Sequence, residues 1–526
     1  MTPPITKQRI TMTTKSAKSL KPVESESKLG DSSEPSAVTV RMYCHGLGDC
    51  FLLTFPRKSM RPFYMLIDCG VILGTSNSRA VMKNVVSSIA QVTTELDVLV
   101  VTHEHWDHVS GFCDAEEEFK KLTVHNVWVA WTENPTDPLA RKLKAEKTRT
   151  ITALTHAASQ LRGAQPGAEE SLLEVLGFFG PSAVGVAGAH STERAMDNAI
   201  GLSAKPPRYC LPTDDPFNVS ELQGVRFYVL GPPHNEQRIK RALPTKSGKE
   251  TYLSSLALTP ETAFMMAACR GAAEQTDLGN AVLQELARPF DSSWCISKEE
   301  AKNIFFFCEH YLGSDDSQDQ AWRNIDTAWL GTAGQLALQL DTYTNNTSLV
   351  LAIEFTDTDK VFLFAADAQV GNWLSWADQS WQVGEGGERK EVSSEDLLRR
   401  TILYKVGHHG SHNATLRANG LELMTSPELI ALVPVNREMA IKKRWAGMPF
   451  PSLLNRLMDK TAGRVLRIDD QLTPAQQAAP QGTPAPVWTR FQQNVKRSQD
   501  GLYYEITFPE LMDVKNVLTR PSTMTA

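Results

Sequence analysis

The sequence has no long hydrophobic run: nowhere do about eighteen apolar residues follow one another, as a membrane-spanning helix requires. Its N-terminal segment carries charge but no apolar core, so it lacks the pattern of a secretory signal. Cysteine is sparse, with 8 residues and no Cys-x-x-Cys pair. Scattered cysteines are typical of thiols in a reducing compartment, so we expect a cytoplasmic protein without a membrane segment.

An excess of basic charge is missing as well. The 54 Lys and Arg residues are outnumbered by 60 Asp and Glu residues, which gives a net charge of -6. Because domains that coat nucleic acid are usually basic, this balance disfavours a nonspecific nucleic-acid binder, although a local basic groove would escape the argument. The apolar share of 41% and the charged share of 22% are those of an ordinary soluble globular protein.

Composition separates two tails from a folded part. Residues 1–37, rich in Lys, Ser, Thr and Pro, cannot bury enough surface to offset the entropy cost of ordering, so we expect a disordered tail. Residues 38–515 are expected to form one folded domain, and 516–526 a C-terminal tail. Two stretches, at about 113–224 and 234–344, are expected to be helical insertions in that domain.

Runs of strand length, rich in apolar, β-branched and aromatic residues, recur along the folded part. Several are apolar on both faces, as expected for a sheet that is covered on each side. The expected strands are 38–44, 50–55, 63–68, 96–103, 225–233, 348–355, 360–367, 401–408, 429–435, 464–469 and 502–508. Helical spacing of apolar residues is found over 78–92, 138–162 and 170–180, and SSEDLLRR begins with capping serines. The alternation predicts an α/β fold.

The chain has 12 histidines, and two short windows hold half of them. The first window is HEHWDH, with His103, His105 and His108, and the second is HHGSH, with His408, His409 and His412. Each follows an expected strand directly, and two other strands run into Asp68 and Asp367. In layered α/β proteins ligands bind beyond the carboxyl ends of strands, and neutral imidazole is the commonest metal ligand.

The spacing predicts two metal ions. His103 and His105, two apart in an extended segment, can share one ion, and Asp107 and His108 can reach a second. Asp367 is placed to bridge them, because a carboxylate offers two oxygens. His408 or His409 would complete the second site. Mixed His and Asp ligation favours Zn²⁺, with Mn²⁺ or Fe²⁺ as alternatives. The alternative is that HEHWDH is a solvated polar turn and HHGSH a loop. Both histidine clusters and both aspartates would then lie at strand ends by coincidence.

At these residues the chain resembles the metallo-β-lactamase-fold hydrolases, whose signature is HxHxDH. The order of the motifs is similar to that of the ComEC-like branch, although the transmembrane part of the DNA-uptake protein that names the branch has no counterpart here. The motifs are GLGDCFLL (46–53), YMLIDCG (64–70), DVLVVTHEHWDHVSGF (97–112), YVLGPP (228–233), NNTSLVL (345–351), VFLFAADAQ (361–369), VGHHGSH (406–412) and VLRIDD (465–470). The resemblance implies an αββα four-layer sandwich with helical insertions.

Residue by residue, the resemblance assigns the metal ligands His103, His105, Asp107, His108, Asp367 and one of His408 and His409. It implies that Asp68 is buried next to the metal ligands and orients them by hydrogen bonding. It also matches Asp49 to the aspartate of a Gly-x-Gly-Asp element. Two departures stand out. Ala366 replaces the glycine that usually precedes the Asp367 position, and the third histidine beside His103 and His105 has no clear counterpart. His234 and His190 are the candidates for that place.

We therefore expect a hydrolase that uses a hydroxide activated by two metal ions, on a small-molecule or nucleic-acid phosphodiester. The expected catalytic residues are Asp107, His408, His409 and His412, and Ser411 and Asn413 are expected to contact phosphate. The same ligands would equally serve a hydrolase of carboxylic esters, lactones, lactams or thioesters. A third alternative is a binding or sensor module that keeps the fold without catalysis. The sequence favours phosphoesters only through the resemblance.

Overall fold

The structure is a computed structural model that describes residues 37–58, 60–161, 166–186, 188–241, 298–312, 333–384, 389–443, 447–470 and 473–512, together with Ile296 and Trp445. The expected tails, apart from Ala37, lie outside these residues, as does most of the insertion expected at about 234–344. Among the described helices, none is both long enough and apolar enough to cross a membrane. All six cysteines described are free thiols.

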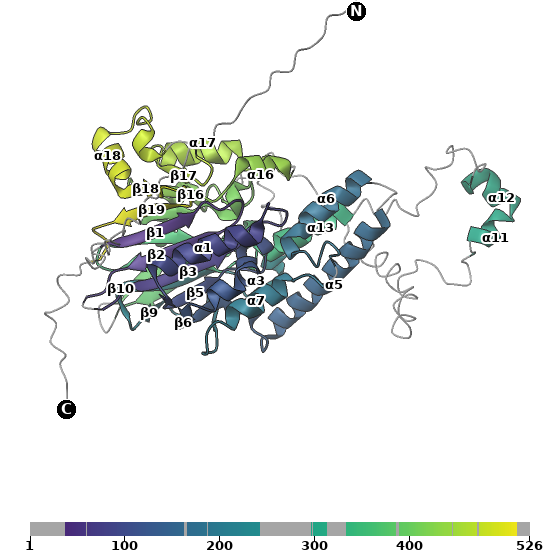
Figure 1. Cartoon of the computed structure of the whole chain (residues 1–526), viewed down its shortest axis with the longest axis horizontal. Helices are drawn as coiled ribbons and strands as arrows, with labels where there is room; N and C mark the ends of the chain where they lie inside the picture. Colours follow the sequence, from purple (N-terminus) through teal and green to yellow (C-terminus); the bar gives the residue numbers. More distant parts are fainter. Residues whose placement is uncertain are drawn as a thin grey trace, which may run out of the picture. The chain divides into compact units, whose positions relative to one another are not determined.

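The chain is a mixed α/β structure built around two large sheets (Figure 1). In the first, β1, β2 and β3 run antiparallel to one another, and β3, β5, β7 and β8 run parallel. Its strands, in spatial order, are β18 (Val495–Arg497), β19 (Tyr503–Phe508), β1 (Val38–Tyr43), β2 (Cys50–Phe55), β3 (Phe63–Cys69), β5 (Val98–Val101), β7 (Val127–Ala130) and β8 (Arg208–Cys210).

The second sheet is also mixed, with β12, β15, β16 and β17 parallel and β9 to β12 antiparallel. Its strands, in spatial order, are β17 (Val465–Arg467), β16 (Ile430–Val433), β15 (Thr401–Lys405), β12 (Lys360–Phe364), β11 (Val350–Phe355), β10 (Leu222–Gly231) and β9 (Phe217–Val219). Two small pairs are β13 (Ser380–Val383) with β14 (Lys390–Ser393), and β4 (Glu95–Leu96) with β6 (Thr123–Val124).

Alternate residues of the strands belong to different cores, because successive side chains point to opposite faces of a sheet. Met65 and Ile67 of β3 share one hydrophobic cluster with Phe227 of β10, so the two sheets face each other across it. Leu66, between them, belongs to a cluster with α1 (Ser78–Val92), α3 (Gly111–Asp114) and α7 (Thr192–Ile200). The outer side of the second sheet packs on α5 (Pro138–Leu161), α6 (Pro166–Leu176), α13 (Ala333–Asn345), α15 (Ser394–Arg399) and α17 (Pro451–Lys460).

Every strand expected from the sequence is present, with ends that shift by a few residues. The segment at about 113–224 is less helical than expected: it contains β7 and β8 of the first sheet and β9 of the second, with α5, α6 and α7 between β7 and β8. These strands have only three or four residues, too few to show an alternating pattern. The remaining helices are α2 (Trp106–Val109), α4 (Glu116–Phe119), α8 (Glu236–Ile239), α11 (Lys298–Lys302), α12 (Phe305–Phe307), α14 (Val370–Trp373), α16 (Arg437–Lys442) and α18 (Ala485–Asn494).

Candidate metal centre

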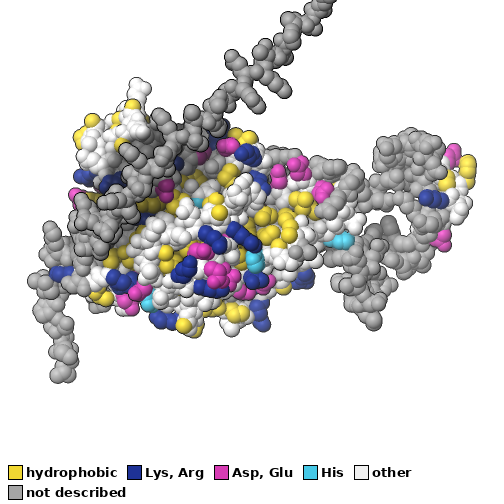
Figure 2. All heavy atoms as spheres, in the orientation of Figure 1, with side chains coloured by type: hydrophobic (Ala, Val, Ile, Leu, Met, Phe, Trp, Pro, Cys, Tyr) yellow, Lys and Arg dark blue, Asp and Glu magenta, His cyan; other side chains and the backbone are white. Residues whose placement is uncertain are grey.

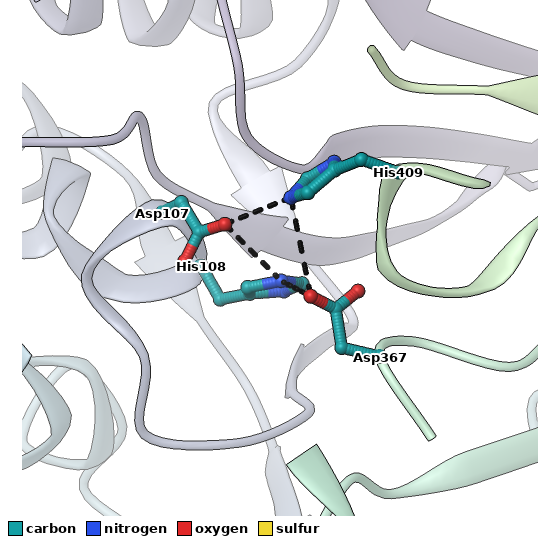
Figure 3. Close-up of side chains that lie close together, drawn as sticks. All are labelled: Asp107, His108, Asp367 and His409. Atoms are coloured by element: carbon teal, nitrogen blue, oxygen red, sulfur yellow. Dashed lines mark hydrogen bonds and ion pairs between the residues drawn. The ribbon is translucent and has the colours of Figure 1, made fainter. Parts of the chain in front are cut away.

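The two sheets bring together the carboxyl ends of two pairs of parallel strands. In the first sheet, β3 ends at Asp68 and Cys69, and its neighbour β5 leads into the segment from His103 to His108. In the second sheet, β12 leads into Asp367 and its neighbour β15 into His408 and His409. Figure 3 shows the result, with side chains from distant parts of the sequence pointing toward one another.

The short helix α2 carries Asp107 and His108, and it lies directly on the end of β3. A Cβ atom on Gly70 would be 2.5 Å from the carbonyl carbon of Asp107, so only glycine fits between the two segments. The backbone N–H of Asp49 donates to the carbonyl oxygen of Asp107 at 3.0 Å, which fixes the turn from the other side. Asp107 and His108 are both fully buried as a result.

Four of the buried side chains form a tight group, Asp107, His108, Asp367 and His409, in which one ligand atom from each lies within 4.8 Å of the others. His409 Nε2 is 2.8 Å from Asp107 Oδ2, and His108 Nε2 is 3.2 Å from Asp367 Oδ2. His409 Nε2 also lies 3.9 Å from Asp367 Oδ2. Buried His and Asp groups this close together could bind a metal ion, and they settle which adjacent histidine faces Asp107: it is His409.

The hydrogen bonds behind these histidines determine what faces the carboxylates. His108 Nδ1 donates to Asp68 Oδ2 at 2.8 Å, and His409 Nδ1 donates to the carbonyl oxygen of Pro434 at 2.7 Å. In a neutral imidazole the other nitrogen then carries a lone pair, which here points at a carboxylate oxygen. Two lone pairs at this distance repel unless a cation or a proton lies between them. The donor set therefore fits a divalent cation, which would replace the protons.

The same buried carboxylates determine the protonation of His108 and His409 when no metal ion is bound. Burial alone would lower the pKa of His108, but the surrounding carboxylates, Asp367 foremost, outweigh it and hold the pKa well above its usual value. Burial would likewise lower the pKa of His409, but the hydrogen bond to Asp107 and the nearby carboxylates outweigh burial and raise that pKa. Strongly shifted groups that face one another in this way are typical of functional sites.

His103 and His105 form a second set of donors beside the first. Both are fully buried, and neither His103 Nε2 nor either nitrogen of His105 has a hydrogen-bond partner among the described residues. Burial lowers the pKa of His105 to about 3, so its imidazole is neutral at physiological pH. The rings of Phe178 and Phe179, in the turn after α6, lie 5.3 and 5.0 Å from that of His105 and shield it from water.

Two further residues position the ligands. Asp68 accepts hydrogen bonds from the backbone and the hydroxyl of Thr102, at 2.8 and 2.7 Å, as well as from His108. Asp49 is buried and forms an ion pair with Lys405, whose ammonium also lies 3.1 Å from Asp367 Oδ1. Sequence reasoning missed Lys405, although a lysine inside the apolar run TILYKV is a signal of an internal charge partner.

His408 differs from its neighbour. Its Nδ1 lies 3.1 Å from both Gln369 Nε2 and Ser411 Oγ, and its Nε2 has no hydrogen-bond partner among the described residues. Asn413 donates to Gln369 Oε1 at 2.7 Å, which turns the amide nitrogen of Gln369 toward His408. These contacts at Nδ1 fix the orientation of the His408 ring. Ser411 and Asn413 act on His408 in this structure, and burial lowers its pKa to about 4.

Three histidines considered from the sequence lie outside these groups. His412 is exposed, and its ring is 6.1 Å from that of Phe450. His234, a candidate for the third ligand, is partly exposed; it bonds to Asp137 at 2.9 Å and packs on Trp131. Its contacts are thus with Asp137 and Trp131, and the structure does not bring it to His103 and His105. His190 is partly exposed in the loop before α7.

Backbone strain is concentrated at the same place. Of the seven non-glycine residues with positive φ among those described, four adjoin the ligands: Asp68 (55°), Ala366 (47°), His408 (40°) and His409 (52°). Ala366 holds the left-handed conformation that a glycine would adopt without cost. Strain of this kind persists only where the surroundings enforce it, commonly at functional sites.

A cavity of about 430 Å³ adjoins the segment that carries His103 and His105, since Glu104 lines it. Two of its basic side chains are already in ion pairs: Lys147 pairs with Glu104, and Lys240 lies 2.6 Å from Glu146. The cavity therefore offers no free positive charge from these two lysines to an anion.

In comparisons with known proteins, neither a family model nor a curated protein matches this chain.

Proposed function

We propose that the chain is a metal-dependent hydrolase with a metallo-β-lactamase-type αββα sandwich, acting on phosphodiesters. The observation that carries the proposal is the convergence of buried His and Asp side chains at four strand ends, with polar atoms that have no partner. Two facing sheets with helices on their outer sides are consistent with that sandwich. A buried set of unpaired nitrogens and carboxylate oxygens is costly to maintain without a ligand.

The donor set divides into two places for divalent ions. One would be held by Asp107, His108, Asp367 and His409, and the other by His103 and His105, with Asp367 able to serve both. When bound, such ions would polarise the phosphoryl group and lower the pKa of water toward neutrality. Zn²⁺ suits this mixture of imidazole and carboxylate, and Mn²⁺ and Fe²⁺ are alternatives.

The protein's own residues would prepare the site and bind the substrate. Asp68 and the Pro434 carbonyl accept from Nδ1 of His108 and His409, which leaves Nε2 of each ring as the nitrogen that would bind a metal ion in place of a proton. His408, a neutral imidazole with an unpartnered Nε2, would contact a phosphoryl or leaving-group oxygen. Phe178 and Phe179 exclude bulk water, which strengthens each of these electrostatic interactions.

The burial of the centre supports a small diester over duplex nucleic acid. His103, His105, His108 and His409 are 0% exposed, and His408 is 5% exposed. On the face drawn in Figure 2, basic and acidic side chains are interspersed, so the described part of this face offers no broad basic track to a phosphate backbone. Elsewhere in the described residues, ion pairs such as Lys144 with Glu193 at 2.9 Å offset basic charge. The net charge of -6 agrees with this reasoning.

The test is hydrolysis by metal-loaded protein of bis(p-nitrophenyl) phosphate, single- and double-stranded DNA, p-nitrophenyl acetate and a chromogenic cephalosporin. We expect metal-dependent turnover of the small diester, which Asp107→Ala should reduce by at least about a hundredfold, as is typical when a group essential for positioning is lost. Asp114→Ala is the matched control, because Asp114 is also buried but lies in α3, near Arg79. Bound metal without turnover of any phosphodiester would refute the proposal.

A further inference from the structure

The two expected ion places are unequal in their ligands. The group around His409 has four side chains, whereas His103 and His105 have only Asp367 to share. Catalytic zinc sites commonly use three protein ligands and keep one position open. The third histidine expected at this place is missing, since His234 bonds to Asp137 elsewhere. A side chain from another element would have to complete the set.

Asp341, in the last turns of α13, lies at that place. It is buried, its Oδ1 has no hydrogen-bond partner, and that oxygen lies 3.9 Å from His105 Nε2. Its second oxygen, Oδ2, accepts a hydrogen bond from Asn345 at 3.1 Å, which orients the carboxylate. Within the described part of the chain, no Lys or Arg forms an ion pair with it. A buried carboxylate without a counter-charge is costly unless a cation binds to it.

We propose that Asp341 is the third protein ligand of the ion held by His103 and His105. The proposal rests on the metal centre of the proposed function and adds a ligand to it. Two ligands of one tetrahedral ion, each about 2.0–2.2 Å from it, are roughly 3.4 Å apart. The observed separation of 3.9 Å between Asp341 Oδ1 and His105 Nε2 therefore needs to close by only about half an ångström.

The electrostatic environment of Asp341 is consistent with a ligand. Asp341 lies within reach of the negative charges of Asp107 and Asp367. Three carboxylates thus face one place. A divalent ion would relieve this repulsion, and a purely structural aspartate on a helix face would gain nothing from facing it.

The assignment also gives the helical insertions a role. α13 forms the end of the insertion expected at about 234–344, and it packs against α5 and α6 of the other. One insertion would then supply the ligand Asp341, and the other the rings of Phe178 and Phe179 that cover His105. A set of two histidines and a carboxylate is harder than three histidines, so this place should accept Mn²⁺ or Fe²⁺ more readily than a three-histidine site would.

The experiment compares the full-length wild type with Asp341→Asn, Asp341→His and Asp114→Asn. Metal-free proteins are titrated with Zn²⁺ and Mn²⁺ against a chelator, and bound metal is counted by mass spectrometry. We expect two ions in wild type and in Asp114→Asn, and a loss of affinity of at least about tenfold for one ion in Asp341→Asn. Asp341→His should regain the ion and raise the preference for Zn²⁺ over Mn²⁺.

Thermal unfolding of the metal-free proteins separates ligation from a structural role. Asparagine removes a buried charge, so metal-free Asp341→Asn should be as stable as wild type or more stable, and only its stabilisation by metal should shrink. Two ions bound by Asp341→Asn with unchanged affinity would overturn the proposal. An equal loss of stability with and without metal would also overturn it. A wild type that binds no metal would instead refute the proposed function itself.

Discussion

Asp68→Asn is the substitution that best tests how the protein prepares its ligands. Asp68 has a φ of 55°, a left-handed conformation that asparagine tolerates better than most residues. The side chains of aspartate and asparagine have nearly the same shape, so the substitution changes charge and hydrogen bonding without a steric or backbone penalty. Alanine at this position would add strain and confuse the result.

The expected effect follows from the hydrogen bonds that Asp68 accepts. The backbone N–H of Thr102 needs an acceptor at Oδ1, so the amide group of asparagine would be placed where Oδ2 is. That position faces His108 Nδ1 at 2.8 Å, and the amide N–H would force this nitrogen to become an acceptor. Nε2, the nitrogen that faces Asp367, would then be the only nitrogen of His108 able to hold a proton. A protonated nitrogen cannot bind a metal ion.

We therefore expect Asp68→Asn to weaken binding at the His409 group by about 10- to 100-fold, the range typical for partners of metal-binding histidines. This corresponds to about 1.4–2.8 kcal/mol. Competition titration with a chelator measures the affinity, and histidine NMR resonances of the metal-free protein report which nitrogens of His108 carry protons. A variant that keeps wild-type affinity, with Nδ1 of His108 still protonated, would refute the reasoning.

Two further predictions concern the frame around the centre. Gly70→Ala should destabilise the protein by about 1–3 kcal/mol or more in denaturant unfolding, because the new Cβ would meet the backbone of Asp107; an unchanged midpoint would contradict the packing described for α2. Lys405→Met should destabilise the metal-free protein by about 3–5 kcal/mol, since it leaves Asp49 and Asp367 buried without their cation. Metal loading should restore part of the lost stability. An equal loss of stability with and without metal would contradict the role given to Lys405 as a counter-charge.

The sequence predicted the strands well because their apolar runs are long. β3, β12 and β15 each have at least five residues, nearly all buried, and the polar residue that ends each run marks the site. β7, β8 and β9 were missed because they are too short to show a strand pattern of their own, and their pairing with neighbouring strands stabilises them. The capping box at Ser393 and Asp396 shows the opposite case, in which local chemistry alone determined where a helix begins.

The side chains of the candidate site that the sequence could not identify are those that depend on backbone geometry or on a distant element. His408 and His409 are adjacent, and only their left-handed backbone decides that His409 faces Asp107 while His408 faces Gln369. Asp341 is separated from His105 by more than two hundred residues, and it lies in a helix whose other buried residues are mostly apolar or small. Neither position carries a local motif.

The arrangement of these residues suggests how the centre could change its substrate while its chemistry is kept. The group around His409 is built wholly on strand ends and on α2, and each of its histidines is fixed by a hydrogen bond from behind. The surroundings of His105 are different, since Phe178, Phe179 and Asp341 all come from the helical segments between strands. Substitutions there would alter access, and also the metal if Asp341 binds it, without disturbing the sheets. For the proposed hydrolase, substitutions on the His105 side should therefore change substrate preference, and substitutions on the His409 side should abolish hydrolysis.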